Sequence, residues 1–185
     1  EYALKALEVL NNTQGIPDYS IAATYNRVFK AYIELEEYNA AIELALKHFE
    51  EVKTTENVSD VKLGFAYNLI AISYKWSAEK IKDKKIASSY FVAAIKHFNL
   101  AITSWSEDTN DQNLKRARAT INVGLCEHEV LRIGLETKSI NSKKIIEMIE
   151  KGLKEIKDPK LESFLTKPTK ALIENAEATL LNLTK

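Results

Sequence analysis

Apolar residues recur at steps of three and four along most of the chain, which is the spacing that gives a helix one buried face. No segment alternates apolar and polar residues for long enough to indicate a strand. The sequence therefore predicts an all-α protein. One helix is expected to end near Leu10, and others to cover about residues 18–36, 39–52, 59–81, 86–105, 112–135, 143–156 and 169–183, with a short turn at 161–165.

The predicted helix over residues 59–81 differs from the others because its apolar side chains do not form a single stripe. They fall on more than one helical face: Phe65, Leu69, Ile70, Ile72 and Trp76. A helix that is apolar on two sides packs between neighbours. We therefore expect this segment to be sandwiched inside the fold.

A motif recurs in two of the predicted helices. It begins at Tyr25 and again at Tyr67, an offset of 67 minus 25, or 42 residues. In both places the Tyr is followed directly by Asn, then by an aliphatic residue three positions after the Tyr, and by a second Tyr seven positions after it. A period of this size indicates a repeated helical hairpin.

In these residues the chain resembles the tetratricopeptide repeat (TPR) family, whose first helix carries an aromatic, a large aliphatic, a small residue and a Tyr in that order. These four positions are matched by Tyr67, Ile70, Ala71 and Tyr74. The small, aromatic and small positions of the family's second helix are matched by Ala94, Phe98 and Ala101. Small side chains at such positions let antiparallel helices approach to about 8–10 Å.

The resemblance implies antiparallel helix hairpins stacked as a right-handed superhelical array over residues 1–160, best matched in 22–102, with a C-terminal capping helix in 161–185. Two features depart from the family. Its period is about 34 residues, shorter than the offset here, so the second hairpin must have longer helices. A third hairpin over residues 120–153 is degenerate: Gly124 and Gly152 fit the small positions, but Glu127 stands where Tyr is expected.

Charge and composition narrow the expected partners. Lys plus Arg and Asp plus Glu both total 26, so no overall field draws the chain to nucleic acid or to a membrane surface, and we expect contact with neither. No apolar stretch approaches the roughly 20 residues that span a bilayer. The single Cys126 is typical of a reducing compartment, which predicts a cytoplasmic protein, and the Lys-, Ile- and Asn-rich composition looks bacterial. Helical periodicity from the first residue suggests a fragment of a larger protein, and a homodimer is also compatible.

The sequence predicts no catalytic residue, no cofactor and no metal, and hence not an enzyme. Each glycine is isolated, so no phosphate-binding loop is present. Glu127, His128 and Glu129 are the one cluster that could act as a metal or acid–base site, but the zinc-protease pattern needs a second His where Arg132 stands. We expect this cluster on a partly exposed polar face. Cys126 lies among aliphatic residues and is interpreted as a small core residue rather than a nucleophile.

The resemblance to TPR proteins implies that the first helix of each hairpin lines an inner groove. An Asn side chain there offers a donor and an acceptor, which suits the backbone of an extended peptide. Two alternatives stay open: the asparagines could instead form hydrogen bonds within or between helices, and Trp76 could be packed in the core. The expected groove residues are Asn26, Lys30, Phe65, Asn68, Ile72, Lys75, Trp76, Arg118 and Asn122.

The expected function is a non-enzymatic scaffold or adaptor module that binds a protein or peptide partner, either an extended peptide or a partner helix, in its concave groove. The alternative is the peptide-sensing C-terminal domain of a bacterial transcriptional or response regulator, which a helix-turn-helix segment before Glu1 would favour. A metal-dependent helical enzyme at Glu127, His128 and Glu129 is a third hypothesis.

Overall fold

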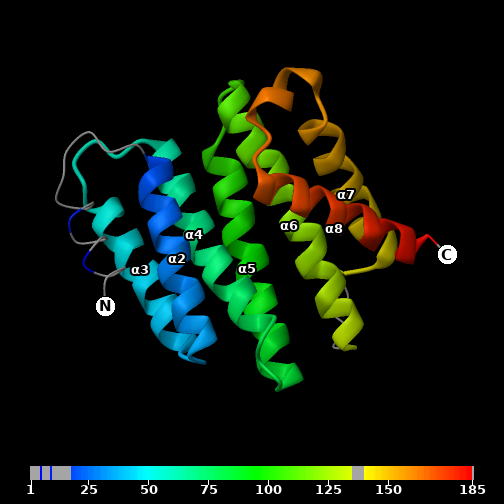
Figure 1. Cartoon of the computed structure of the whole chain (residues 1–185), viewed down its shortest axis with the longest axis horizontal. Coiled ribbons are helices and arrows are strands. Elements are labelled where there is room, and N and C mark those ends of the chain that lie inside the picture. The colour runs from blue at the N-terminus through cyan, green and yellow to red at the C-terminus, as the bar shows by residue number, and fades with distance from the viewer. Residues whose placement is uncertain (1–4, 6–8, 10–17, 135–139, 185) are drawn as a thin grey trace.

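The computed structural model describes residues 18–134 and 140–184, together with residues 5 and 9. This part of the chain is helical and contains no strand, which confirms the predicted all-α class. The helix expected to end near Leu10 falls almost entirely outside the described residues. The elements are α2 (Asp18–Glu34), α3 (Tyr38–Lys53), α4 (Asp60–Ala78), α5 (Lys84–Ser104), α6 (Asn110–Ile133), α7 (Ser142–Ile156), the 3-10 helix η1 (Pro159–Phe164) and α8 (Lys167–Leu183) (Figure 1).

Side-chain caps account for several of the helix boundaries. The Ser59 Oγ accepts a hydrogen bond from the Lys62 N–H at the start of α4, and Thr109 and Asn141 do the same for α6 and α7. Asp83 caps α5 from within a lysine-rich connection. Gly134 ends α6 with a φ of 78°, a left-handed conformation that favours glycine.

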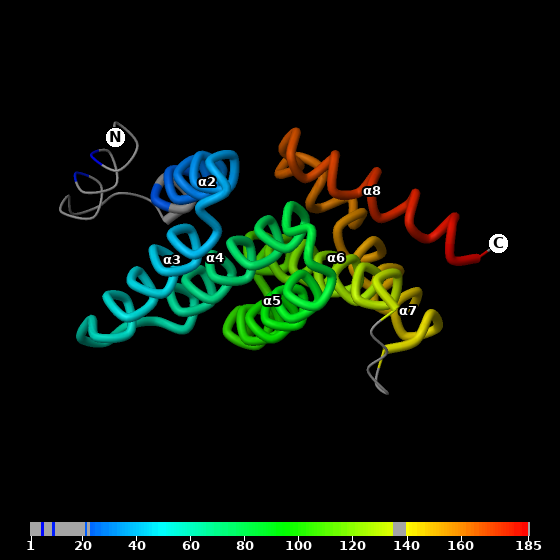
Figure 2. The backbone as a smooth tube through the Cα atoms, turned by 90° about the horizontal axis from the view of Figure 1, so that it is seen from below, coloured from blue at the N-terminus to red at the C-terminus, as the bar shows by residue number. Residues whose placement is uncertain are grey.

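The helices pack mainly against their neighbours in sequence. The pairs α2–α3, α4–α5 and α6–α7 are in contact, α4 also packs on α2 and α3, α5 packs on α6, and α8 packs on α6 and α7. Figure 2 shows α2 and α8 on one side of the molecule, well apart from each other, with α5 on the opposite side. No helix in the described ranges is long and apolar enough to cross a membrane.

Helix α4 is buried on two sides, as the sequence predicts. Leu69 and Ile70 belong to a core cluster with the buried aromatics of α2, whereas Ala71 and Ala78 belong to a second cluster with α5 and α6. A third cluster joins α6 to α7, η1 and α8. Because α4 takes part in two of the three clusters, its orientation fixes how the first hairpin sits on the second.

Small residues permit close helix packing in the second and third hairpins. Ala94 and Ala101 of α5 are fully buried. A Cβ added at Gly124 of α6 would lie 2.5 Å from Cγ1 of Ile149 in α7, and one at Gly152 of α7 would lie 2.6 Å from Cγ1 of Ile121 in α6. The two glycines therefore set the separation of α6 and α7.

Replacing Gly124 with Ala tests this packing. Gly to Ala inside a helix ordinarily stabilises by roughly 0.5–1 kcal/mol. Here the added methyl group overlaps a fully buried Ile149, so we expect a loss of about 1–3 kcal/mol in the free energy of unfolding, measured by urea denaturation. A gain in stability would show that α6 and α7 are not in close contact at this point.

Candidate functional site

Two cavities lie along the same pair of helices, α4 and α6. The residues that line them advance by three or four positions, so each helix turns one continuous face towards the space between them. The first cavity, of about 640 Å³, meets Val61, Phe65, Asn68 and Ile72 of α4 and Asp111, Leu114, Lys115, Arg118 and Asn122 of α6. The second, of about 430 Å³, meets Lys75 and Ala78 of α4, Glu79 directly after it, and Leu125, His128, Glu129 and Arg132 of α6. It is also bordered by the start of α5 and by Asn175 and Thr179 of α8.

We name the first the asparagine cavity, the second the ion-pair cavity, and both together the α4–α6 cleft. The asparagine cavity is bounded on one side by α2, which contributes Ala23 and Asn26. On the other side lie Phe164, the last residue of η1, and Thr166, the residue before α8. Trp105, directly after α5, also lines the cavity, which is therefore assembled from five parts of the chain.

The two equivalent asparagines line the asparagine cavity from different helices. Within the described residues, neither the Asn26 nor the Asn68 side chain forms a hydrogen bond, and the Oδ1 of Asn26 is buried without a partner. The structure thus gives no support to the alternative that these amides join helices. Asn122 differs, because its Nδ2 donates to the backbone oxygen of Arg118 at 3.0 Å.

Arg118 is the cation in this cavity that lacks a counter-charge. It is partly buried, and in the described parts of the chain its guanidinium takes part in no hydrogen bond or ion pair. Desolvation by burial lowers the pKa of Arg118, although an arginine stays protonated at neutral pH. A partly buried charge without a partner reduces the free energy of unfolding, so its presence needs another explanation.

Lys115, the other cation of the asparagine cavity, is already engaged. Its Nζ forms an ion pair with Asp111 one turn earlier and lies 4.1 Å from the centroid of the Phe65 ring. A cation over an aromatic face is held electrostatically. Lys115 therefore lies over the Phe65 ring and is neutralised by Asp111. The positive charge of Arg118 is the one charge of the lining that is not neutralised by another.

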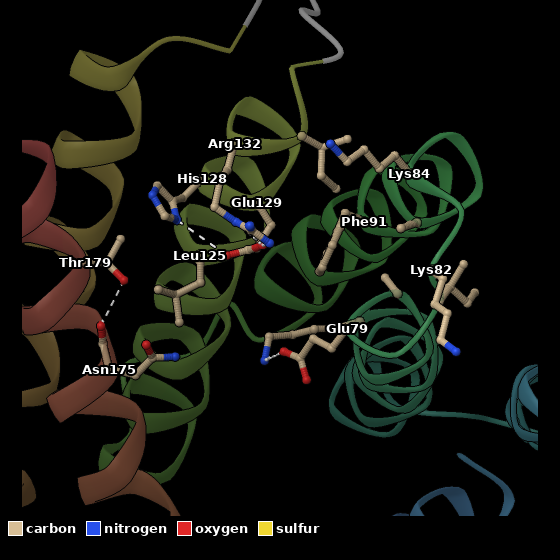
Figure 3. A pocket seen from close by; sticks show the side chains of 15 residues that line it. Glu79, Lys82, Lys84, Phe91, Leu125, His128, Glu129, Arg132, Asn175 and Thr179 are labelled. Atoms are coloured by element: carbon tan, nitrogen blue, oxygen red, sulfur yellow. Dashed lines mark hydrogen bonds and ion pairs between the residues drawn. The ribbon is translucent and has the colours of Figure 1, made fainter. Parts of the chain in front are cut away.

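Lys75 and Arg132 of the ion-pair cavity each pair with a carboxylate of the protein, whereas Lys82 and Lys84 line the same cavity, are exposed, and form no ion pair among the described residues (Figure 3). Lys75 Nζ lies 2.9 Å from Oε1 of Glu79. Glu129 Oε2 accepts hydrogen bonds from Nη2 and Nε of Arg132 at 2.7 and 2.9 Å, and the Nδ1 of His128 lies 3.6 Å from the other oxygen of Glu129. Burial by itself lowers the pKa of Lys75, but the nearby carboxylates, Glu79 first, raise it overall.

The structure separates the expected groove residues into two groups. Three of them do not line the asparagine cavity. Lys75 borders the ion-pair cavity, and Lys30 is exposed, with its Nζ 5.4 Å from the ring centroid of Trp76. Trp76 packs against the core cluster of α2, α3 and α4, which corresponds to the packing alternative, and it does not line the asparagine cavity. The residues that do line it are Asn26, Phe65, Asn68, Ile72, Arg118 and Asn122.

Helical spacing could have revealed some of the residues that sequence reasoning missed. Asp111, Leu114 and Lys115 lie seven, four and three positions before Arg118, so they share its face of α6. Phe164 and Thr166 carry no such signal, because their place depends on how the C-terminal segment returns to the cavity.

The expectation that Glu127 lies on a partly exposed polar face is wrong. Its side chain is only 3% exposed, and its Oε1 accepts a hydrogen bond from Nζ of Lys144 at 2.8 Å. The burial arises because α7 packs over this part of α6 and supplies the lysine. His128 and Glu129 are partly exposed. Across residues 18–134 and 140–184, no group of three or more His, Cys, Asp and Glu side chains is placed to hold a metal ion.

Cys126 lies in the core between α4, α5 and α6 and is fully buried. Desolvation raises the pKa of its thiol to about 12, and the nearby Lys75 only partly offsets this. The thiolate is the nucleophilic form of cysteine, so at neutral pH this group is unreactive in the folded protein.

Comparison with protein-family models, curated protein sequences and solved structures gave no match to this chain.

The burial of Cys126 predicts its behaviour towards thiol reagents. At neutral pH we expect the folded protein to resist labelling by iodoacetamide, and the urea-unfolded chain to react at the rate of a free cysteine, because both burial and the raised pKa protect the thiol. Mass spectrometry of both states measures this. Rapid labelling of the folded protein would contradict the interpretation of Cys126 as an unreactive core residue.

Arg118 and Arg116 form a matched pair for a stability test on one helix. Arg116 donates to the backbone oxygens of Trp105 and Glu107 at 2.6 and 2.9 Å, so Arg116→Met should destabilise the fold. Arg118→Met removes a charge without a partner, and we expect it to stabilise by about 0.5–2 kcal/mol. Thermal unfolding checks both variants. If Arg118→Met instead lowers the Tm as Arg116→Met does, Arg118 has a structural role.

Proposed function

We propose that this protein is a non-enzymatic binding module that holds an extended peptide segment of a protein partner in the α4–α6 cleft. The observation that carries the proposal is the set of polar groups without partners in the asparagine cavity. Asn26, Asn68 and Arg118 come from three different helices, yet among the described residues none of their side chains forms a hydrogen bond or ion pair. Polar groups that lose water without gaining a partner destabilise a fold, and a bound ligand would supply those partners.

An extended peptide suits these groups better than a partner helix does. Amide side chains can pair with the N–H and C=O groups of a peptide backbone whatever its side chains are. A helix uses most of its backbone groups internally and offers few of them to Asn26 and Asn68. From Val61 to Ala78 the cleft follows α4 for about 26 Å at 1.5 Å per residue, which accommodates roughly eight extended residues.

The resemblance to TPR proteins supports the same proposal. In that family the first helices of the hairpins line the inner groove, and here α2, α4 and α6 all contribute to the asparagine cavity. We propose that the hairpins form a right-handed array of this type, with α8 as its capping helix. Small-angle X-ray scattering would test that arrangement, because a superhelical array gives a more elongated scattering profile than a compact bundle.

Asn68→Ala tests the proposed function directly. A randomised ten-residue peptide library displayed on phage is selected against the wild-type protein, and a selected peptide is then titrated by calorimetry. Loss of the amide should weaken binding by about 1–3 kcal/mol, roughly 5- to 150-fold, since ligand backbone groups would be left without partners. The Tm should hardly change, since the Asn68 side chain bonds to no other described residue.

Asn99→Ala is the matched control. Asn99 lies on an exposed position of α5 and lines neither cavity, so its loss should leave affinity unchanged. A library that yields no binder, or binders that are indifferent to Asn68→Ala, would contradict the proposed function. Early melting of Asn68→Ala with wild-type affinity would show that this amide is structural.

A further inference from the structure

The chemistry of the asparagine cavity specifies one feature of its ligand. We propose that Arg118 binds the carboxylate of an Asp or Glu side chain in the interior of the bound peptide, and that the module therefore selects segments with an acidic residue at one fixed position. This inference rests on the proposed peptide-binding function and adds the class of segment that the cleft accepts.

The first step is the charge balance of the cavity lining. Its charged residues are Asp111, Lys115 and Arg118. Asp111 and Lys115 neutralise each other, and Lys115 is also held over the ring of Phe65. The lining therefore carries one net positive charge, located on Arg118. In the adjoining ion-pair cavity, the partly buried Lys75 pairs with Glu79 and Arg132 pairs with Glu129, while Lys82 and Lys84 have no such partner but are exposed to solvent.

The second step is the chemical form of the missing partner. A guanidinium presents its donors as a planar fork that matches the two oxygens of a carboxylate. Arg118 is partly buried, which also lowers its pKa, and a charge-assisted hydrogen bond is stronger where water is excluded. Asn26 and Asn68 border the same cavity and are suited to a peptide backbone, which indicates that the carboxylate belongs to a peptide.

The third step places the acidic group within the segment rather than at its C-terminus. The cleft continues past Arg118 in both directions along α6, to Leu114 on one side and to Asn122 and Leu125 on the other. A chain that ended at Arg118 would leave one part of the cleft empty. A side chain that reaches Arg118 lets the backbone pass between α4 and α6 and fill both cavities.

The test compares peptides selected by three forms of the protein from the same randomised ten-residue library. Wild-type protein should enrich Asp or Glu at one position, and Arg118→Glu should enrich Lys or Arg there instead, because the charge of the site is reversed. Arg118→Met should bind the wild-type-selected peptide at least about 30-fold more weakly. The control Arg27→Met, at an exposed position of α2 that lines neither cavity, should bind as the wild type does.

Changes to the peptide complete the test. Replacing the enriched Asp by Asn should weaken binding to the wild type by a similar factor but should have little effect on Arg118→Met, since the pair is already broken in that variant. Amidation of the C-terminus should leave affinity unchanged. A large loss on amidation would overturn the assignment to an interior side chain.

The outcomes separate this inference from the proposed function. Peptides without acidic enrichment whose binding still depends on Asn68 would overturn the role of Arg118 and leave the binding module intact. Equal affinity of Arg118→Met and the wild type for the acidic peptide would do the same. Selection of no peptide at all would overturn both.

Discussion

The packing of α4 on two sides is the constraint on which the rest of the structure depends. One side joins the core of the first hairpin through Leu69 and Ile70, and the other joins α5 and α6 through Ala71 and Ala78. Since both sides are fixed, the remaining face of α4 is held in place opposite α6. A site built on rigid helices keeps its geometry without a ligand, and this limits the entropy lost on binding.

The two cavities of the α4–α6 cleft differ in whether their partly buried polar and charged side chains have partners within the protein. In the ion-pair cavity Lys75 and Arg132 have carboxylate partners, and Lys82 and Lys84, which have none among the described residues, are exposed to solvent. In the asparagine cavity the polar groups of Asn26, Asn68 and Arg118 lack partners among the described residues. A buried polar group without a partner, such as the Oδ1 of Asn26, makes the fold less stable, and a ligand that supplied the partner would offset this cost. The groups without partners are the physical basis for proposing that the asparagine cavity binds a ligand.

Most of the fold could be predicted from the sequence, but only part of the lining of the asparagine cavity could be. Helical periodicity placed every helix between residues 18 and 183, because an amphipathic stripe is a local property of the chain. The Tyr-Asn motif identified Asn26 and Asn68 as equivalent, and both line one cavity. The burial of Glu127 and the place of Phe164 could not be predicted, since they depend on Lys144 in α7 and on the return of the C-terminal segment. The helical pattern was equally compatible with Trp76 in the core and with Trp76 in the groove. Its packing against the core cluster of α2, α3 and α4 depends on the tertiary structure.

The most direct test of the account is whether a selected peptide occupies the α4–α6 cleft. In heteronuclear NMR spectra of the protein, the side-chain NH₂ resonances of Asn26 and Asn68 report on this cavity, and that of Asn99 reports on an exposed position of α5. Titration with the peptide should shift the signals of Asn26 and Asn68 saturably and leave that of Asn99 unchanged. Saturable binding that leaves both cavity amides unshifted would place the ligand elsewhere and contradict the assignment of the cleft.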